Sequence, residues 1–241
     1  MKSREKFCVL GATIACAGLA LAGMLIGPPQ GRADDQGNAS DLRIERGFEI
    51  APVPLNLEGK NRDLVGLGSY IVNTEGCNDC HDAGPPTEYV VPGGNPYFGK
   101  PKQVNTKYYL GGGRDFLALV PGSAHIISRN LTPAPNNKTG LPGGDITLEK
   151  FFEIFRHGTD FDNLHPNCPL GAAPNTTCIP APFDGNLLQV MPWPNFKDLT
   201  DHETRAIYEY LRAVPCIQGN YPGPGGVDAN IPPEPADRCS E

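Results

Sequence analysis

The length of 241 residues fits one domain with appendages, and a hydrophobic content of 39% is enough for that domain to bury a core. Acidic residues outnumber basic ones by 27 to 20, which gives a net charge of −7 at pH 7. Because the chain is acidic and has no basic stripe, we exclude nucleic acid as a partner.

The N-terminus has the pattern of an export signal. Three basic residues among the first six precede an uncharged run over 7–26, and Gly-Pro-Pro at 27–29 ends that run. We predict a signal peptide over 1–33, cleaved after the small residue Ala33. Because twenty apolar residues also reach across a bilayer, an uncleaved N-terminal anchor stays open, and it would be the chain's association with the membrane. Either form places the rest of the chain in the periplasm.

Residues 34–60 are polar and interrupted by prolines, so we expect an extended arm. From residue 62 onward, apolar residues recur at helical spacing, and Asn61 is placed to cap the helix. Gly66 and Gly68 each weaken this helix by about 1 kcal/mol relative to alanine, which suggests that another helix packs close to the bare backbone. The apolar positions are Leu64, Val65, Leu67, Tyr70, Ile71 and Val72.

Directly after this helix comes Cys77-Asn78-Asp79-Cys80-His81. A C-x-x-C-H run is typical of the attachment of a c-type heme. The thiols of Cys77 and Cys80 can add to the two vinyl groups of one porphyrin, and His81 supplies the proximal imidazole to the iron. A thioredoxin-like redox pair would not need the histidine, and a zinc site needs a second Cys or His pair at ligand spacing, which we do not find. We therefore predict one covalently bound heme c.

The next stretch, over 82–145, is rich in Gly, Pro and Asn and has few periodic runs. We expect a loop with short hairpins around 108–113 and 116–120. A loop of this length is uncommon unless something orders it, and the porphyrin face would supply the apolar surface.

Two more helices follow from the pattern of apolar residues and caps. The first is predicted over 146–157, and it ends before Gly158, where a C-terminal glycine belongs. The second begins at a capping box formed by Thr200 and Glu203. The predicted heme domain therefore spans 61–215, and irregular chain connects these two helices.

Four cysteines remain after the export segment and the heme motif are set aside. An even remainder in an oxidising compartment suggests two disulfides. The sequence allows three pairings, and short loop closure favours the first with the second and the third with the fourth. The second bridge would fold the Pro- and Gly-rich tail over 216–241 back onto the domain. The four residues are Cys168, Cys178, Cys216 and Cys239.

Heme iron in an electron carrier takes a second axial ligand, and methionine is the usual partner of histidine. Met191 is the only methionine left after export, so we predict it as the distal ligand. Trp193 stands close by in the sequence, and we expect it to pack against the porphyrin. A histidine ligand stays open, as does a vacant position, which would mean ligand binding or catalysis. The histidines are His125, His157, His165 and His202.

The stretch from about Leu64 to Pro215 resembles the class I c-type cytochromes. It is most similar to the monoheme cytochrome c domains of the cytochrome subunits of alcohol, aldehyde and gluconate dehydrogenases. The resemblance implies an all-α cytochrome c fold, with helices around one covalently bound heme and long irregular loops. The motifs are Gly68-Ser69-Tyr70-Ile71, the heme motif, Ser128-Arg129-Asn130-Leu131-Thr132-Pro133 followed by Thr139-Gly140, Phe155-Arg156-His157-Gly158, Met191-Pro192-Trp193, Leu199-Thr200 and the run over 206–212.

The resemblance also implies roles for residues around the heme. The helix before the heme motif would cross the last helix. Arg129 and Asn130 would lie near the heme edge, at the propionates, with a surface turn as the alternative. A proline carbonyl would accept the proton of the proximal imidazole, which orients the ring and tunes the metal. The candidate prolines are Pro85, Pro86 and Pro92.

We expect an electron carrier and not an enzyme. Its redox partners would be a donor dehydrogenase or quinol-linked complex and an acceptor such as an oxidase. Two alternatives stay open: a catalytic heme protein, peroxidase-like or thiosulfate-oxidising, and a heme subunit of a dehydrogenase complex. Dehydrogenase subunits of the family often carry three such domains, whereas this chain has one C-x-x-C-H motif and therefore one heme.

Overall fold

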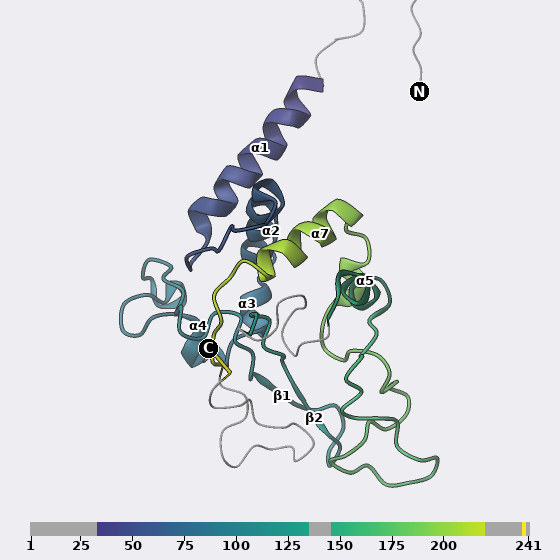
Figure 1. Cartoon of the computed structure of the whole chain (residues 1–241). Helices are drawn as coiled ribbons and strands as arrows, with labels where there is room; N and C mark the ends of the chain where they lie inside the picture. Colours follow the sequence, from purple (N-terminus) through teal and green to yellow (C-terminus); the bar gives the residue numbers. More distant parts are fainter. Residues whose placement is uncertain (1–32, 135–145, 220–237, 240–241) are drawn as a thin grey trace, which may run out of the picture.

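The computed structural model describes residues 33–134, 146–219 and 238–239 (Figure 1). Residues 1–32 of the predicted signal peptide lie outside this part of the chain. No helix within the described part is both long enough and apolar enough to cross a bilayer. The elements are α1 (Ala33–Ile50), α2 (Arg62–Thr74), α3 (Cys77–Cys80), α4 (Pro85–Glu88), a 3-10 turn (Pro96–Phe98), β1 (Asp115–Ala118), β2 (His125–Ile127), α5 (Leu148–His157), α6 (Trp193–Phe196) and α7 (Asp201–Leu211).

Three helices form the frame of the domain: α2 packs against both α1 and α7 (Figure 1). The predicted N-cap holds, because the Asn61 side chain accepts hydrogen bonds from the backbone N–H groups of Asp63 and Leu64. The buried side chains of this frame meet those of α5 in one apolar core. Each fully buried aliphatic side chain contributes roughly 1.5–3 kcal/mol. The frame contributes Val65, Leu67, Val72, Ala206, Ile207 and Leu211.

Glycines set the distances within this frame, as their place in the sequence suggested. A Cβ on Gly68 would lie 1.9 Å from the carbonyl oxygen of Ala206 in α7. A Cβ on Gly47 of α1 would lie 1.8 Å from the carbonyl oxygen of Gly66. Real Cβ atoms do not approach this closely, so both crossings require backbone without side chains. The predicted crossing of the helix before the heme motif with the last helix is present.

The expected extended arm over 34–60 is wrong for its first part, because α1 is helical from Ala33 to Ile50. Its contacts with α2 include close backbone approach: Ile44 and Phe48 lie against Gly66, the Gly47 carbonyl accepts a hydrogen bond from Ser69 Oγ, and the Arg62 guanidinium stacks over the Phe48 ring. A contact made in part by backbone and small residues leaves no strong apolar period in the sequence. Packing against α2, more than local propensity, stabilises this helix.

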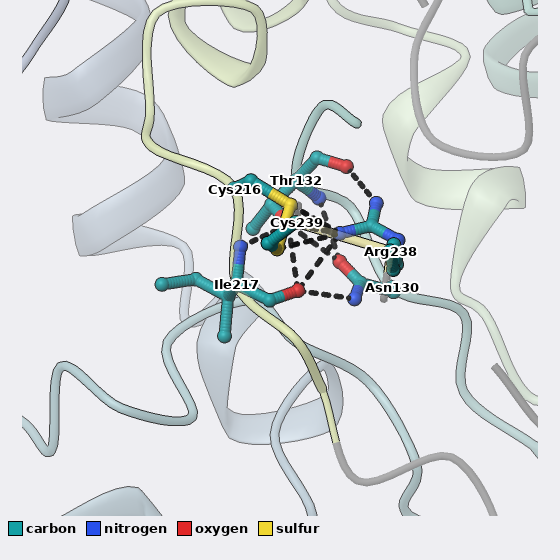
Figure 2. The surroundings of a disulfide bond; sticks show 6 residues. All are labelled: Asn130, Thr132, Cys216, Ile217, Arg238 and Cys239. Carbon is teal, nitrogen blue, oxygen red and sulfur yellow. Dashed lines mark hydrogen bonds between the residues drawn. A yellow bond between two sulfur atoms is a disulfide. The ribbon is translucent and has the colours of Figure 1, made fainter. Parts of the chain in front are cut away.

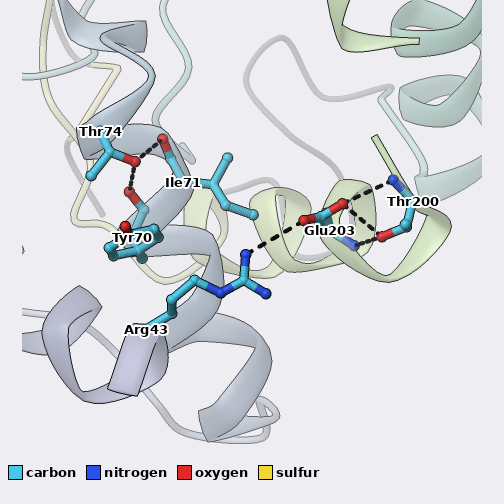
Figure 3. A network of polar contacts seen from close by, with 6 residues as sticks. All are labelled: Arg43, Tyr70, Ile71, Thr74, Thr200 and Glu203. Carbon is cyan, nitrogen blue, oxygen red and sulfur yellow. Dashed lines mark hydrogen bonds and ion pairs between the residues drawn. The ribbon is translucent and has the colours of Figure 1, made fainter. Parts of the chain in front are cut away.

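An ion pair links α1 to α7 at the start of α7 (Figure 3). Thr200 and Glu203 form the predicted capping box. The Glu203 carboxylate also lies 3.6 Å from the Arg43 guanidinium of α1. In the same view, the Thr74 hydroxyl at the end of α2 donates to the Tyr70 carbonyl at 2.7 Å.

A buried hydrogen-bond network crosses the frame. The Tyr109 hydroxyl donates to Asn73 Oδ1 at 2.8 Å and lies 2.8 Å from the Tyr210 hydroxyl. Asn73 Nδ2 donates to the Ser69 carbonyl at 2.9 Å, and Ser69 Oγ donates to the Gly47 carbonyl at 2.7 Å. Desolvation raises the pKa of both tyrosines. A satisfied network of neutral groups of this kind fixes one arrangement of α1, α2 and α7.

The long loop is more structured than its composition suggested. β1 and β2 form one antiparallel hairpin, close to the expected hairpin at 116–120, while residues 108–113 form turns instead of strands. The fold therefore carries a small sheet beside its helices. The next helix, α5, begins two residues later than predicted and ends at Gly158, with φ of 69°.

Both predicted disulfides are present: Cys168 pairs with Cys178, and Cys216 pairs with Cys239. Figure 2 shows the surroundings of the second bridge. Arg238, next to Cys239, donates hydrogen bonds to the Ile217 carbonyl at 2.8 Å and to Thr132 Oγ1 at 3.1 Å. The end of the chain is thus bound to the segment that follows Arg129 and Asn130.

Candidate heme site

The heme motif is held by hydrogen bonds from one neighbouring segment, residues 110–112. Gly76 precedes it with φ of 71°, a left-handed conformation that glycine adopts without a steric penalty. The buried Asn78 side chain accepts a hydrogen bond from Leu110 N at 2.8 Å. Gly112 N donates to the His81 carbonyl at 2.9 Å. These bonds fix α3 and His81 against the turns over 108–113.

Cys77 and Cys80 are free cysteines, and both line the same cavity. Desolvation, with the carboxylate of Glu75 adding to it, raises the pKa of Cys77 to about 12. Desolvation also raises the pKa of Cys80, against the opposing charge of Arg114. The nucleophilic cysteine of a thiol–disulfide enzyme has a lowered pKa. This environment therefore does not favour the redox-pair alternative.

The imidazole of His81 has a defined tautomer. Its Nδ1 lies 2.7 Å from the Arg129 carbonyl oxygen. Because a carbonyl only accepts, Nδ1 carries the proton and Nε2 keeps its lone pair, which is the form that binds metals. Desolvation lowers the pKa of His81, which also favours the neutral ring.

The acceptor for His81 was expected among Pro85, Pro86 and Pro92, and that expectation is wrong. Gly112 explains how the Arg129 peptide reaches the ring. With φ of 67°, it lies so close that a Cβ would stand 2.4 Å from the Arg129 carbonyl carbon. A bare backbone at Gly112 therefore makes room for the Arg129 carbonyl beside the imidazole of His81.

The cavity at the motif has a volume of about 260 Å³. Its walls are mainly apolar and come from α2, β2, α5 and α7. Moving a flat apolar group from water into this cavity would therefore be favourable. The apolar wall includes Val72, Ile127, Phe151, Phe155, Ile207 and Leu211.

Met191, the predicted distal ligand, lines this cavity together with the heme motif. The residue before it, Val190, has φ of 69°, a conformation that a β-branched residue adopts only where the surroundings enforce it. Hydrogen bonds enclose the turn: Met191 N donates to the Gln189 carbonyl, and Trp193 N donates to the Met191 carbonyl, both at 2.8 Å. Strain of this kind is often found at functional sites.

Trp193 does not lie in the cavity wall that the described residues form. Its indole Nε1 donates to the Leu188 carbonyl at 3.2 Å, and its ring covers Gly158, where a Cβ would stand 2.3 Å from the ring. The tryptophan thus braces the Met191 turn against the end of α5. Its expected contact with a porphyrin stays a prediction.

Arg129 and Asn130 both line the cavity. Asn130 Nδ2 donates to the Ile217 carbonyl at 3.0 Å (Figure 2). The Arg129 guanidinium pairs with Asp160 at 3.0 Å and also with Asp162. Protein groups therefore already engage both side chains, and the expected contact with propionates stays a prediction.

The four histidines differ in whether they line the cavity. His165 is buried and lines the cavity. His125 pairs with Asp115 at 2.9 Å, His157 is mostly exposed beside Glu153, and His202 is exposed on α7. The candidates for a distal ligand that reach the cavity are therefore Met191 and His165.

Sequence reasoning missed Asp160 and Asp162. They stand 31 and 33 positions from Arg129, in an irregular segment with no periodic pattern. No local signal in a single sequence predicts such a pairing.

In the part of the chain that the structure describes, His, Cys, Asp and Glu side chains form no group of three or more that could hold a metal ion. Comparisons with known proteins give no match: no family model, no curated protein and no solved structure matches this chain.

Proposed function

We propose that this chain is an exported, monoheme c-type cytochrome that carries single electrons. The proposal assigns it a donor dehydrogenase or quinol-linked complex and an acceptor such as an oxidase, in the periplasm. One observation carries the proposal: Cys77, Cys80, His81 and Met191 all line one apolar cavity. A heme bound there would supply reversible one-electron chemistry at its iron.

The residues at the cavity suit this cofactor chemically. Two unpaired thiols are available for thioether bonds, and the neutral His81 keeps Nε2 for the iron. The Arg129 carbonyl orients the imidazole and raises its basicity, which is the usual work of a group behind a metal ligand. The thioether of Met191 would be the second protein ligand to the iron, a weaker donor that would favour the reduced state.

The first test is the optical spectrum of the protein made with an intact cytochrome maturation system. We expect one covalent heme by mass and the weak near-infrared band that marks sulfur coordinated to ferric iron. Met191→Ala should abolish that band, whereas His165→Ala should leave it in place. A colourless mature protein, or a band that persists in Met191→Ala, would contradict the proposal.

A second measurement separates the carrier from a Cys-ligated catalytic protein. In the mature, heme-loaded chain, four cysteines are in disulfides and two would be in thioethers, so a thiol reagent added under denaturing conditions should find none. A free thiol in that titration would favour the catalytic alternative.

A further inference from the structure

Arg129 makes one contact through its backbone carbonyl and others through its side chain. Its carbonyl oxygen accepts a hydrogen bond from His81 Nδ1 at 2.7 Å. Its guanidinium pairs with Asp160 through Nη2 at 3.0 Å and with Asp162 through Nη1. The Arg129 side chain is 29% exposed and the Asp160 side chain 16%, so water screens this pair only partly.

The Arg129 peptide cannot easily move away from His81. Gly113 N donates to the Ser128 carbonyl and Leu131 N donates to the Leu110 carbonyl, at 2.9 and 2.8 Å. These bonds hold the segment on both sides of Arg129 against the turns that also bind the heme motif. The side chain of Arg129 therefore starts from a fixed point beside the proximal ligand.

Asp160 belongs to the segment that leads to Met191. Its N–H donates to the Asn186 carbonyl at 2.9 Å, and the neighbouring Thr159 forms an antiparallel bridge with Leu187. Leu188 N donates to the Gly158 carbonyl at 2.7 Å. The turn that presents Met191 begins directly after these residues. Backbone hydrogen bonds thus connect the position of Asp160 to that of the turn that carries Met191.

We propose that Arg129 is a positioning residue that ties the two axial ligands together. Its backbone orients His81, while its guanidinium holds the Asp160–Asp162 segment and, through that segment, the turn of Met191. The inference rests on the proposed function, because it assumes that His81 and Met191 ligate one iron. It also gives the guanidinium a task other than binding propionates.

The test measures how easily an added ligand displaces Met191. Imidazole binds to the iron of such a protein only when the methionine leaves, so its apparent affinity reports how firmly the Met191 turn is held. In Asp160→Asn we expect imidazole to bind more tightly, on the order of tenfold for the loss of one charge-assisted interaction. In Arg129→Gln, which also loses the pair with Asp162, we expect at least the same gain. The sulfur-to-iron band should also fade at a lower temperature than the unfolding of the helices. Because the two groups act as one unit, the double variant should bind imidazole no more tightly than Arg129→Gln.

Arg212→Gln is the matched control. Arg212, the C-cap of α7, pairs with Glu209 at 3.3 Å, with side-chain exposures of 30% and 18% that nearly equal those of the Arg129–Asp160 pair. We expect wild-type imidazole affinity in this control. If Arg129→Gln behaves like the control, the ion pair is only structural and the inference is wrong.

Three further outcomes keep the two proposals separate. If Arg129→Gln does not fold, Asp160→Asn decides, because it leaves the Arg129 peptide and side chain in place. If the wild type lacks the sulfur-to-iron band, or keeps it in Met191→Ala, the ligand assignment itself fails. If those controls behave as expected and Asp160→Asn binds imidazole as the wild type does, only the positioning role fails.

Discussion

The helical frame and the distal segment of this protein are stabilised in different ways. In the frame of α1, α2 and α7, backbone meets backbone at Gly47 and Gly68, and apolar side chains fill the space between the helices. The distal segment over 158–190 contains no helix. It is held by contacts spread along irregular chain: backbone hydrogen bonds, the Cys168–Cys178 disulfide, hydrogen bonds to both ends of the Asn167 amide, and the ion pairs of Arg129.

This difference assigns different tasks to the two regions. The frame carries the C-x-x-C-H motif at the end of α2, so His81, the proposed proximal ligand, is held by the rigid core. The segment that carries Met191 depends on a few separate contacts, and segments of this kind open locally at lower free energy than the core. Substitutions in the frame should unfold the whole domain, whereas substitutions in the distal segment should first loosen the turn of Met191, the proposed distal ligand.

The largest effect is expected where the frame is tightest. In Gly68→Ala, the new Cβ would stand 1.9 Å from the Ala206 carbonyl oxygen, so α2 and α7 must separate. We expect a loss of about 3–4 kcal/mol in the free energy of unfolding, measured by urea denaturation. Gly59→Ala is the control, because no atom lies within 4 Å of the new Cβ and only its φ of 66° opposes the change, at about 1 kcal/mol. Equal losses in the two variants would show that the close crossing does not limit stability.

The counterpart in the distal region is Gly158→Ala. Here φ is 69° and the new Cβ would stand 2.3 Å from the Trp193 ring, which must move. A ring can shift more easily than a helix, so we expect a smaller loss, about 2 kcal/mol. The Met191 turn should follow Trp193, so the sulfur-to-iron band should weaken while the circular dichroism of the helices stays unchanged. Loss of helix and band in a single transition would show that the two regions are not separable.

The same division decides what the sequence could predict. The helices at 62–74, 148–157 and 201–211 follow from apolar period and caps, and the glycine at 68 correctly indicated a close crossing. The C-x-x-C-H motif and Met191, which the sequence singles out, do line one cavity, and their role as heme ligands stays a prediction. By contrast, α1 is stabilised by tertiary contacts, and the pairing of Arg129 with Asp160 joins residues far apart in the chain. Such contacts depend on the fold and leave no local pattern.

The smallest effect is expected for the charge of Glu203, which lies at the start of α7 near Arg43 of α1. Desolvation tends to raise the pKa of Glu203, but hydrogen bonds from Thr200 and the nearby Arg43 guanidinium outweigh it, and the pKa is lowered overall (Figure 3). A carboxylate with a lowered pKa stabilises the folded state above its unfolded pKa of about 4.3, and this stabilisation is lost as the pH falls through the folded value.

Glu203→Gln isolates this charge, because glutamine can still form the capping box. We expect a loss of about 0.5–1 kcal/mol at neutral pH, and no loss once the pH is well below about 4. Urea denaturation at both pH values measures it. Arg43→Gln removes only the ion pair between α1 and Glu203, so we expect a smaller loss of stability. That loss should disappear in roughly 1 M salt, whereas part of the loss in Glu203→Gln should persist there. If Glu203→Gln costs the same at both pH values, the geometry of the cap and not its charge stabilises the start of α7.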